Sequence, residues 1–142
     1  MQSAHRVGFE AIVNLIFSLS PKHTDEYYAQ KACAAASLGT ERICLKDPGA
    51  LLTPERMRTL VPAVLQNAYG IPVELHTHFI TELGPLCWIE AIKLGIRSIN
   101  TAIPPLANAS SNPSLFNGSG PTRLVTAHIR NVARGRLCIL QV

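Results

Sequence analysis

The chain has 142 residues, of which 47% are hydrophobic and 15% are charged, and its formal net charge is +4. This composition excludes an intrinsically disordered protein, which needs low hydrophobicity and high charge, and a solvated coiled coil, which needs far more Glu and Lys. No stretch approaches the roughly 20 consecutive apolar residues of a membrane span. We therefore expect one small domain, or a piece of a larger one, without a membrane span.

The net positive charge comes entirely from the C-terminal tail. Residues 1–114 contain nine basic and nine acidic residues. The tail contains no acid and four arginines, which are Arg123, Arg130, Arg134 and Arg136. Four arginines without interleaved aromatic residues are a weak signal for nucleic-acid binding, so we expect no nucleic-acid partner.

The four cysteines are scattered along the chain, and no two of them have the CxxC spacing. The absence of a CxxC pair excludes a zinc knuckle and a thioredoxin-type site. Scattered thiols in an apolar chain are typical of buried, reduced residues. An acid and an amide also interrupt the apolar stretch that most resembles a secretory signal. We therefore expect a cytoplasmic protein.

Apolar strands alternate with helices along the chain. The predicted strands are residues 11–19, 42–46, 73–78 and 98–103. Between them, Thr24 and Thr53 are expected to cap the amino ends of two helices. Gly39, Gly70 and Gly95 are expected to follow the carboxyl ends of three helices.

This alternation, at a spacing of roughly 25 to 31 residues, is typical of βα units and a parallel sheet. No GxGxxG follows any strand, and polar residues lie at the carboxyl ends of the strands, where barrel enzymes build their sites. A whole barrel takes about 250 residues. We therefore predict an α/β fold that is a partial TIM (β/α)8 barrel of about four βα units. The outer strands, 11–19 and 98–103, should have unpaired edges, so the isolated chain should self-associate.

The segment VELHTH carries candidate metal ligands. Side chains alternate along a strand, so Glu74, His76 and His78 share one face, while Val73 and Leu75 share the other. Helices are expected to cover the apolar face, so that the two histidines point into the barrel mouth. Two imidazoles at i and i+2 converge on one metal ion. The alternative is that both are hydrogen-bonded polar residues at a strand end.

Lys46 lies on the inward face of the preceding strand by the same alternation, because Leu45 packs outward. A lysine inside a barrel is costly unless it is paired or chemically changed. Burial lowers the pKa of a lysine and frees its amine, and reaction with CO2 would form a carbamate, which is an anionic oxygen ligand. The alternative is an ion pair of Lys46 with Asp47 or Glu74.

Ser110 and Ser111 follow the fourth predicted strand on the same rim. A hydroxyl at this place could relay a proton. The alternative is that these serines only solvate the loop.

Three motifs in order carry a resemblance to a known family. At ICLKDPGALLTP (43–54), ELHTH (74–78) and NTAIPPLANASSNPS (100–114), the chain resembles the carboxyltransferase domain of biotin-dependent enzymes. This family includes the oxaloacetate decarboxylase α chain, pyruvate carboxylase and the transcarboxylase subunit. The FSLSPKHTDEYYAQ stretch (17–30) also resembles the family. The similarity divides the chain into a partial carboxyltransferase barrel over residues 1–116, equivalent to barrel strands five to eight, and a divergent basic tail over residues 117–142.

The resemblance implies a site. Lys46 matches the family lysine that is carboxylated and binds a divalent metal, for which zinc is the first choice and manganese or cobalt are alternatives. His76 and His78 match the two histidine ligands, and Ser110 falls where the family places a proton-shuttling hydroxyl. The implied partners are a 2-oxo acid such as oxaloacetate or pyruvate, carboxybiotin as co-substrate, and a biotin carrier.

Two departures from the family pattern stand out. After the second histidine the family commonly has small polar residues and a glycine. This chain instead has FITEL at residues 79–83, whose larger side chains should crowd the mouth of the metal site. The family's fourth metal ligand, an aspartate of the first barrel strand, and its substrate arginine have no counterpart here. We therefore expect a fragment of a carboxyltransferase, as a truncated or frame-shifted gene would produce. The alternative is a non-catalytic half barrel, either a relic or an interaction protein.

Overall fold

A computed structural model gives the structure of residues 2–118 and 137–141. The elements are α1 (Gln2–Arg6), β1 (Glu10–Ile16), α2 (Asp25–Ser37), β2 (Arg42–Asp47), α3 (Pro54–Asn67), β3 (Val73–Thr77), α4 (Gly84–Lys93), β4 (Ser98–Ile99), the 3-10 helix η1 (Leu115–Gly118) and β5 (Leu137–Gln141). None of the helices in these ranges is long and apolar enough to cross a membrane.

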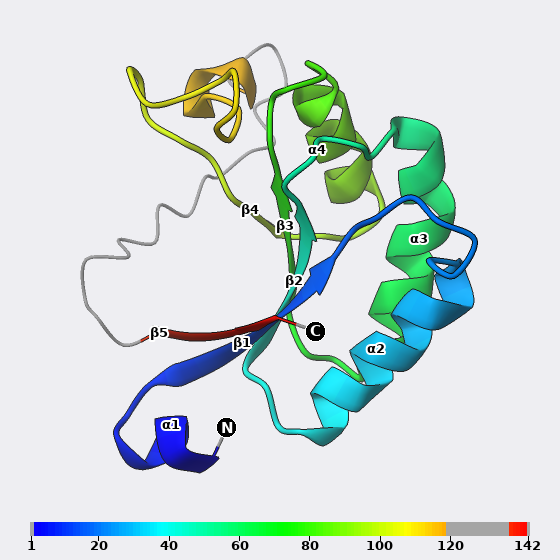
Figure 1. Cartoon of the computed structure of the whole chain (residues 1–142), viewed down its shortest axis with the longest axis vertical. Helices are drawn as coiled ribbons and strands as arrows, with labels where there is room; N and C mark the ends of the chain where they lie inside the picture. Colours follow the sequence, from blue (N-terminus) through cyan, green and yellow to red (C-terminus); the bar gives the residue numbers. More distant parts are fainter. Residues whose placement is uncertain (1, 119–136, 142) are drawn as a thin grey trace.

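The strands form one parallel sheet in the order β4-β3-β2-β1-β5. Helices α2, α3 and α4 all lie along one face of this sheet (Figure 1). The α/β fold with a parallel sheet, predicted from the alternation of strands and helices, is thus confirmed. The described strands form an open sheet with two edges, at β4 and at β5.

Local sequence signals set the helix ends as predicted. The hydroxyl of Thr24 accepts a hydrogen bond from the Tyr27 amide, and the hydroxyl of Thr53 accepts one from the Arg56 amide, each at 3.2 Å. These bonds satisfy amides that have no partner inside the helix. The glycine after each of α2, α3 and α4 has a positive φ, which ends the helix without a side-chain clash.

The core lies between the sheet and the helices. Ile43 and Leu45 of β2 and Leu75 of β3 are fully buried against α3, which contributes Leu60 and Val64. Burying each such side chain stabilises the fold by about 1.5–3 kcal/mol. The intervening residues of β2 and β3 therefore point to the opposite face, which the three helices leave uncovered.

Two predicted strands are shorter than expected. The first leaves the sheet after Ile16, because the Ser18 amide turns to the Tyr28 hydroxyl at 3.0 Å, and Leu19 is 66% exposed. The fourth keeps only Ser98–Ile99, because Ala102 pairs with residue 114 of its own following loop.

The first predicted strand is also not an edge of the sheet. β1 pairs with β2 on one side and with β5 on the other. The expectation of an unpaired edge at residues 11–19 is therefore wrong. Of the predicted basic tail, residues 119–136 and 142 lie outside the described residues, and all four of its arginines are among them.

Candidate functional site

His76 and His78 meet at the carboxyl end of β3, on the face of the sheet away from the helices. Their Nε2 atoms are 3.2 Å apart and their ring centroids 5.2 Å apart. Two nitrogen ligands of a tetrahedral zinc ion, each about 2.0–2.1 Å from the metal, lie about 3.3 Å apart. The spacing of these two nitrogens therefore fits two ligands of one cation.

The lowered pKa of His76 also suits a metal ligand. Burial, as the largest cause, together with the positive charge of Lys46 and the neighbouring His78, lowers its pKa to about 4. A neutral imidazole at pH 7 keeps a nitrogen lone pair free to bind a metal.

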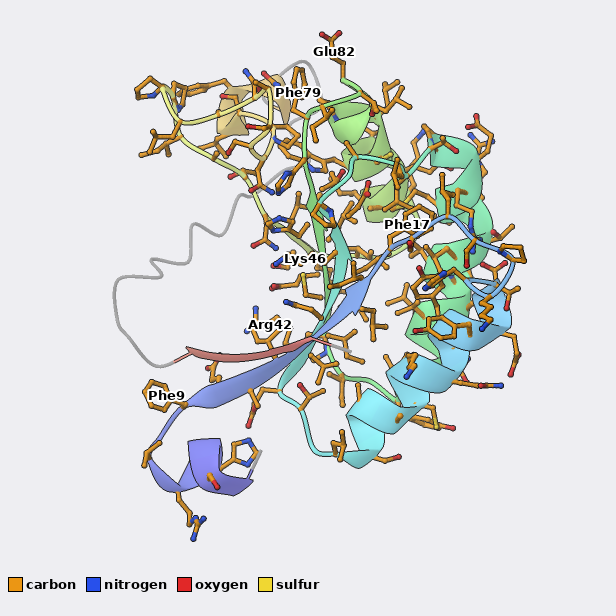
Figure 2. The ribbon with its side chains drawn as sticks, in the orientation of Figure 1. Phe9, Phe17, Arg42, Lys46, Phe79 and Glu82 are labelled. Carbon is orange, nitrogen blue, oxygen red and sulfur yellow. The ribbon has the colours of Figure 1, made fainter. Side chains whose placement is uncertain are left out.

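Lys46 stands beside His76 in the register of β2 and β3. In Figure 2 its side chain lies on the same side of the sheet as Arg42, and Phe17 lies on the helix side. The carboxylate of Asp47 is used by backbone amides and by Thr77, and Glu74 pairs with Arg42. The alternative of a Lys46 ion pair is therefore wrong within residues 2–118 and 137–141, where no carboxylate lies within 4.0 Å of its amine.

The described residues offer few metal ligands at this site. In the described part of the chain, no group of three or more His, Cys, Asp or Glu side chains could hold a metal ion. The two histidines fit a metal, and Lys46 as a carbamate would add an oxygen donor next to them. Any further protein ligand must come from outside this group.

Ser110 lies in the loop that follows β4, which packs against the end of β3. The Phe79 amide donates to the Ser111 carbonyl at 2.9 Å, and the Asn112 amide group donates to the Thr77 carbonyl at 3.1 Å. Ser110 itself is exposed and makes no hydrogen bond with any described residue. The structure thus brings Lys46, His76 and His78 together and leaves Ser110 in the adjoining loop.

The loops around this site are tied together and strained. The Thr81 hydroxyl, in the loop after β3, donates to the Ala50 carbonyl, in the loop after β2, at 2.8 Å. Four non-glycine residues of the three loops have a positive φ, which are Ala50, Glu82, Asn108 and Ala109. Such strain costs about 1–3 kcal/mol per residue and collects at functional sites.

The unusual segment 79–83 forms part of this rim. Ile80 and Glu82 are exposed, and Phe79 is half-buried. No aromatic contact joins Phe79 to either histidine in the described structure. Just beyond the segment, Gly84 starts α4, where a Cβ atom would come within 2.7 Å of Pro113 Cγ. Glycine is required there for the loop after β4 to approach.

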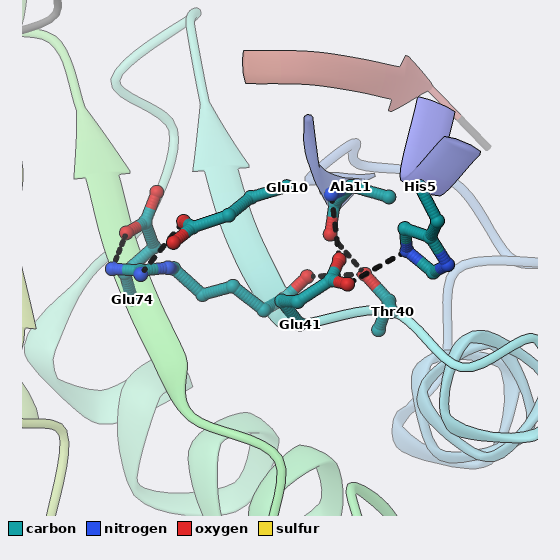
Figure 3. A network of polar contacts seen from close by, with 7 residues as sticks. His5, Glu10, Ala11, Thr40, Glu41 and Glu74 are labelled. Carbon is teal, nitrogen blue, oxygen red and sulfur yellow. Dashed lines mark hydrogen bonds and ion pairs between the residues drawn. The ribbon is translucent and has the colours of Figure 1, made fainter. Parts of the chain in front are cut away.

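A second polar cluster lies at the amino ends of the strands. Arg42 lies 3.3 Å from the Glu74 carboxylate and 3.7 Å from that of Glu10 (Figure 3). In the same cluster, the Glu41 carboxylate accepts from the Ala11 amide at 2.6 Å, and lies 2.6 Å from His5. Burial alone would raise the pKa of Glu41, but these contacts hold it below the usual value. In barrel enzymes the corresponding end of the strands serves stability rather than catalysis.

The sequence pattern offers Asp47 only as a polar residue at a strand end and as a possible ion-pair partner of Lys46. The pattern places it in a turn, but its side chain is fully buried and accepts three hydrogen bonds. The sequence signal for this role is the position of Asp47, which ends an apolar strand and is followed by Pro-Gly. At such a position a carboxylate can accept hydrogen bonds from the amides of the next turn.

Comparison with known proteins supports the resemblance. No protein-family profile matches the chain. The chain is 31% identical over 113 residues to a pyruvate carboxylase subunit of Methanocaldococcus jannaschii, which covers 80% of this chain and 20% of the relative. It is 31% identical over 127 residues to the methylmalonyl-CoA carboxyltransferase 5S subunit of Propionibacterium freudenreichii, covering 88% of this chain and 24% of the relative.

Solved structures show the same fold. The carboxyl transferase domain of Rhizobium etli pyruvate carboxylase superposes with a TM-score of 0.76 at 22% identity, over 81% of this chain and 20% of that chain. The structure of that domain with pyruvate and biocytin superposes with a TM-score of 0.67 at 24% identity, over 72% of this chain and 18% of that chain. The chain thus spans about a fifth of the length of these relatives. The resemblance to carboxyltransferases is confirmed for this part of their length.

Proposed function

We propose that this chain, a relative of one segment of pyruvate carboxylase and transcarboxylase subunits, supplies one side of the site of a metal- and biotin-dependent carboxyltransferase. The reaction moves a carboxyl group between biotin on a carrier and a 2-oxo acid of the oxaloacetate and pyruvate type. The observation that carries this proposal is the meeting of Lys46, His76 and His78 at the carboxyl ends of two adjacent strands. In this proposal residues 1–116 form the barrel segment, residues 117–142 form a separate tail, and the protein acts in the cytoplasm.

Three side chains would hold the metal. His76 and His78 offer Nε2 atoms, and the Lys46 amine, in its unprotonated form, reacts with CO2 to give a carbamate and one proton. A carbamate oxygen then takes the place of a carboxylate ligand. A bound divalent metal, with zinc preferred over manganese or cobalt, would polarise the oxo oxygen of the substrate and stabilise its enolate.

Ser110 would move the proton. Its hydroxyl accepts a proton from the methyl carbon of pyruvate and gives its own proton to the biotin nitrogen from which CO2 has left. The exposure of Ser110 in the loop beside β3 suits a group that must meet a carrier-bound cofactor. Other parts of a complete barrel would have to bind the substrate carboxylate.

Metal binding tests the site directly. We would titrate the metal-free chain with zinc, in bicarbonate buffer, and measure affinity by calorimetry and bound metal by mass spectrometry. His76→Ala and Lys46→Arg should each lose the metal, because an arginine side chain forms no carbamate. His23→Ala is the matched control, because His23 lies in the loop between β1 and α2, where it hydrogen-bonds Ser20. Retention of the metal by His76→Ala would show that the ligand assignment is wrong.

Turnover separates this function from the alternative of a non-catalytic half barrel. The chain would be assayed for oxaloacetate decarboxylation, alone and together with a polypeptide that carries barrel strands one to four of a relative. Metal-dependent turnover in the complex supports the carboxyltransferase. Metal-free, inactive complexes support the interaction protein, and sedimentation analysis would show whether the chain then pairs with itself.

A further inference from the structure

Asp47 lies directly behind the candidate metal ligands. It is the residue after Lys46, and because side chains alternate along β2, it points to the helix side of the sheet. Its side chain is fully buried, as is that of Thr77, the residue between the two histidines. Asp47 and Thr77 therefore flank the site without facing it.

We propose that Asp47 and Thr77 are a positioning pair that fixes His78 relative to Lys46. This inference rests on the proposed metal site. Neither side chain touches the metal in this arrangement. The Thr77 hydroxyl contacts the His78 carbonyl, and Asp47 acts through its carboxylate on that hydroxyl and through its own carbonyl on the His78 amide.

Two contacts join the pair to His78. The Thr77 hydroxyl lies 3.1 Å from Asp47 Oδ2 and 3.3 Å from the His78 carbonyl oxygen, so one hydroxyl proton is placed between both acceptors. The His78 amide donates to the Asp47 carbonyl at 3.1 Å. Since β3 ends at Thr77, this last bond extends the strand pairing to the second histidine.

The Asp47 carboxylate is itself held rigidly. It accepts from the amides of Leu51 and Leu52, each at 2.9 Å, as well as from Thr77. None of the described cations lies within ion-pair distance of it. A buried carboxylate without a cation needs all of these donors, so its position is determined by the loop after β2 and by β3 together.

The consequence is that ligand spacing depends on this pair. The 3.2 Å separation of the histidine nitrogens requires His78 to stay in register one residue beyond its strand. Removing residues that orient metal ligands typically lowers metal affinity 10–100-fold. We expect a loss of this size when the pair is broken.

The test uses the whole chain and cobalt as the probe, because the visible absorption of bound cobalt reports ligand geometry. Thr77→Val removes the hydroxyl at nearly constant volume, and Thr77→Ser restores it. Asp47→Asn removes one acceptor, and Asp25→Asn is its control, since Asp25 pairs with Arg56 away from this carboxylate. Hydrogen exchange of the His78 amide in the metal-free chain is a second readout.

We expect Thr77→Val to bind cobalt 10–100-fold more weakly, with a changed absorption spectrum and faster exchange of the His78 amide. Thr77→Ser and Asp25→Asn should behave as the parent chain does. Equal affinity and an unchanged spectrum in Thr77→Val would overturn the positioning role while leaving the metal site in place. Failure of the parent chain to bind cobalt or zinc would instead overturn the metal site, and the positioning role with it. If Asp47→Asn does not fold, Thr77→Val alone decides.

Discussion

Replacing Arg42 by methionine should destabilise the fold strongly. The Arg42 side chain is 9% exposed, and its closer partner, Glu74, is 12% exposed, so this ion pair is nearly free of water. Breaking a buried pair by removing one partner costs about 3–5 kcal/mol, because the other charge stays buried. The pair with Glu10, which is 55% exposed, adds less than about 1 kcal/mol. One Arg42 nitrogen, Nε, has no partner in the described structure, which places the expected loss near the lower end, at about 3 kcal/mol.

A double-mutant cycle tests the cause of this loss. The free energy of unfolding would be measured by urea denaturation for Arg42→Met, Glu74→Gln and the double variant. Glu74→Gln in the Arg42→Met background should recover about half of the loss or more, since no buried charge is then left without its partner. Glu10→Gln should cost less than about 1 kcal/mol. A loss below about 1 kcal/mol in Arg42→Met, or no recovery in the double variant, would refute the dependence of Glu74 on Arg42.

Three further predictions concern single residues. Glu82→Gly should raise the free energy of unfolding by about 1 kcal/mol, because Glu82 has a left-handed φ of 62°; the control Glu26→Gly, in the first turn of α2, should lower it. Burial raises the pKa of Cys44 and of Cys87 to about 12, so peptide mass spectrometry should find both unmodified by iodoacetamide at pH 8 until the chain is unfolded. In the metal-free chain, protonation of unfolded His76 should lower the free energy of unfolding by about 1–2 kcal/mol from pH 7 to pH 4.5. This range is reduced from the full effect because His76 is partly exposed to solvent. The reason is that the pKa of the His76 imidazole is 6.5 in the unfolded chain and about 4 in the folded chain, so the unfolded chain binds the proton first as the pH falls. An equally steep pH dependence in His76→Gln would contradict this assignment.

The parts of the fold that depend on local sequence were predictable. Threonine caps and glycine stops marked the helix ends, and alternation in VELHTH placed His76 and His78 on one face. These signals work because each is a property of a few neighbouring residues. The strands 42–46 and 73–78 were within one residue of the observed β2 and β3.

The parts that depend on distant partners were not predictable. Nothing in residues 11–19 indicates that β5, more than 120 residues later, pairs with this strand. Likewise, hydropathy alone extends the last predicted strand to residue 103, but pairing of Ala102 with residue 114 removes its end from the sheet. The sequence places Asp47 in a turn but does not predict that its carboxylate joins the loop after β2 to β3, because its three hydrogen-bond donors come from two separate segments.

The two ends of the sheet differ in how they tolerate added chain. At the amino ends of the strands, Gly39 follows α2 and Gly70 follows α3, and a Cβ atom at either glycine would meet nothing within 4 Å. At the opposite end, the rim loops are joined by hydrogen bonds, and Gly84 is hemmed in by Pro113. An affinity tag or a fluorescent label inserted at Gly70, next to the exposed Tyr69, would therefore leave the ligand-bearing rim undisturbed.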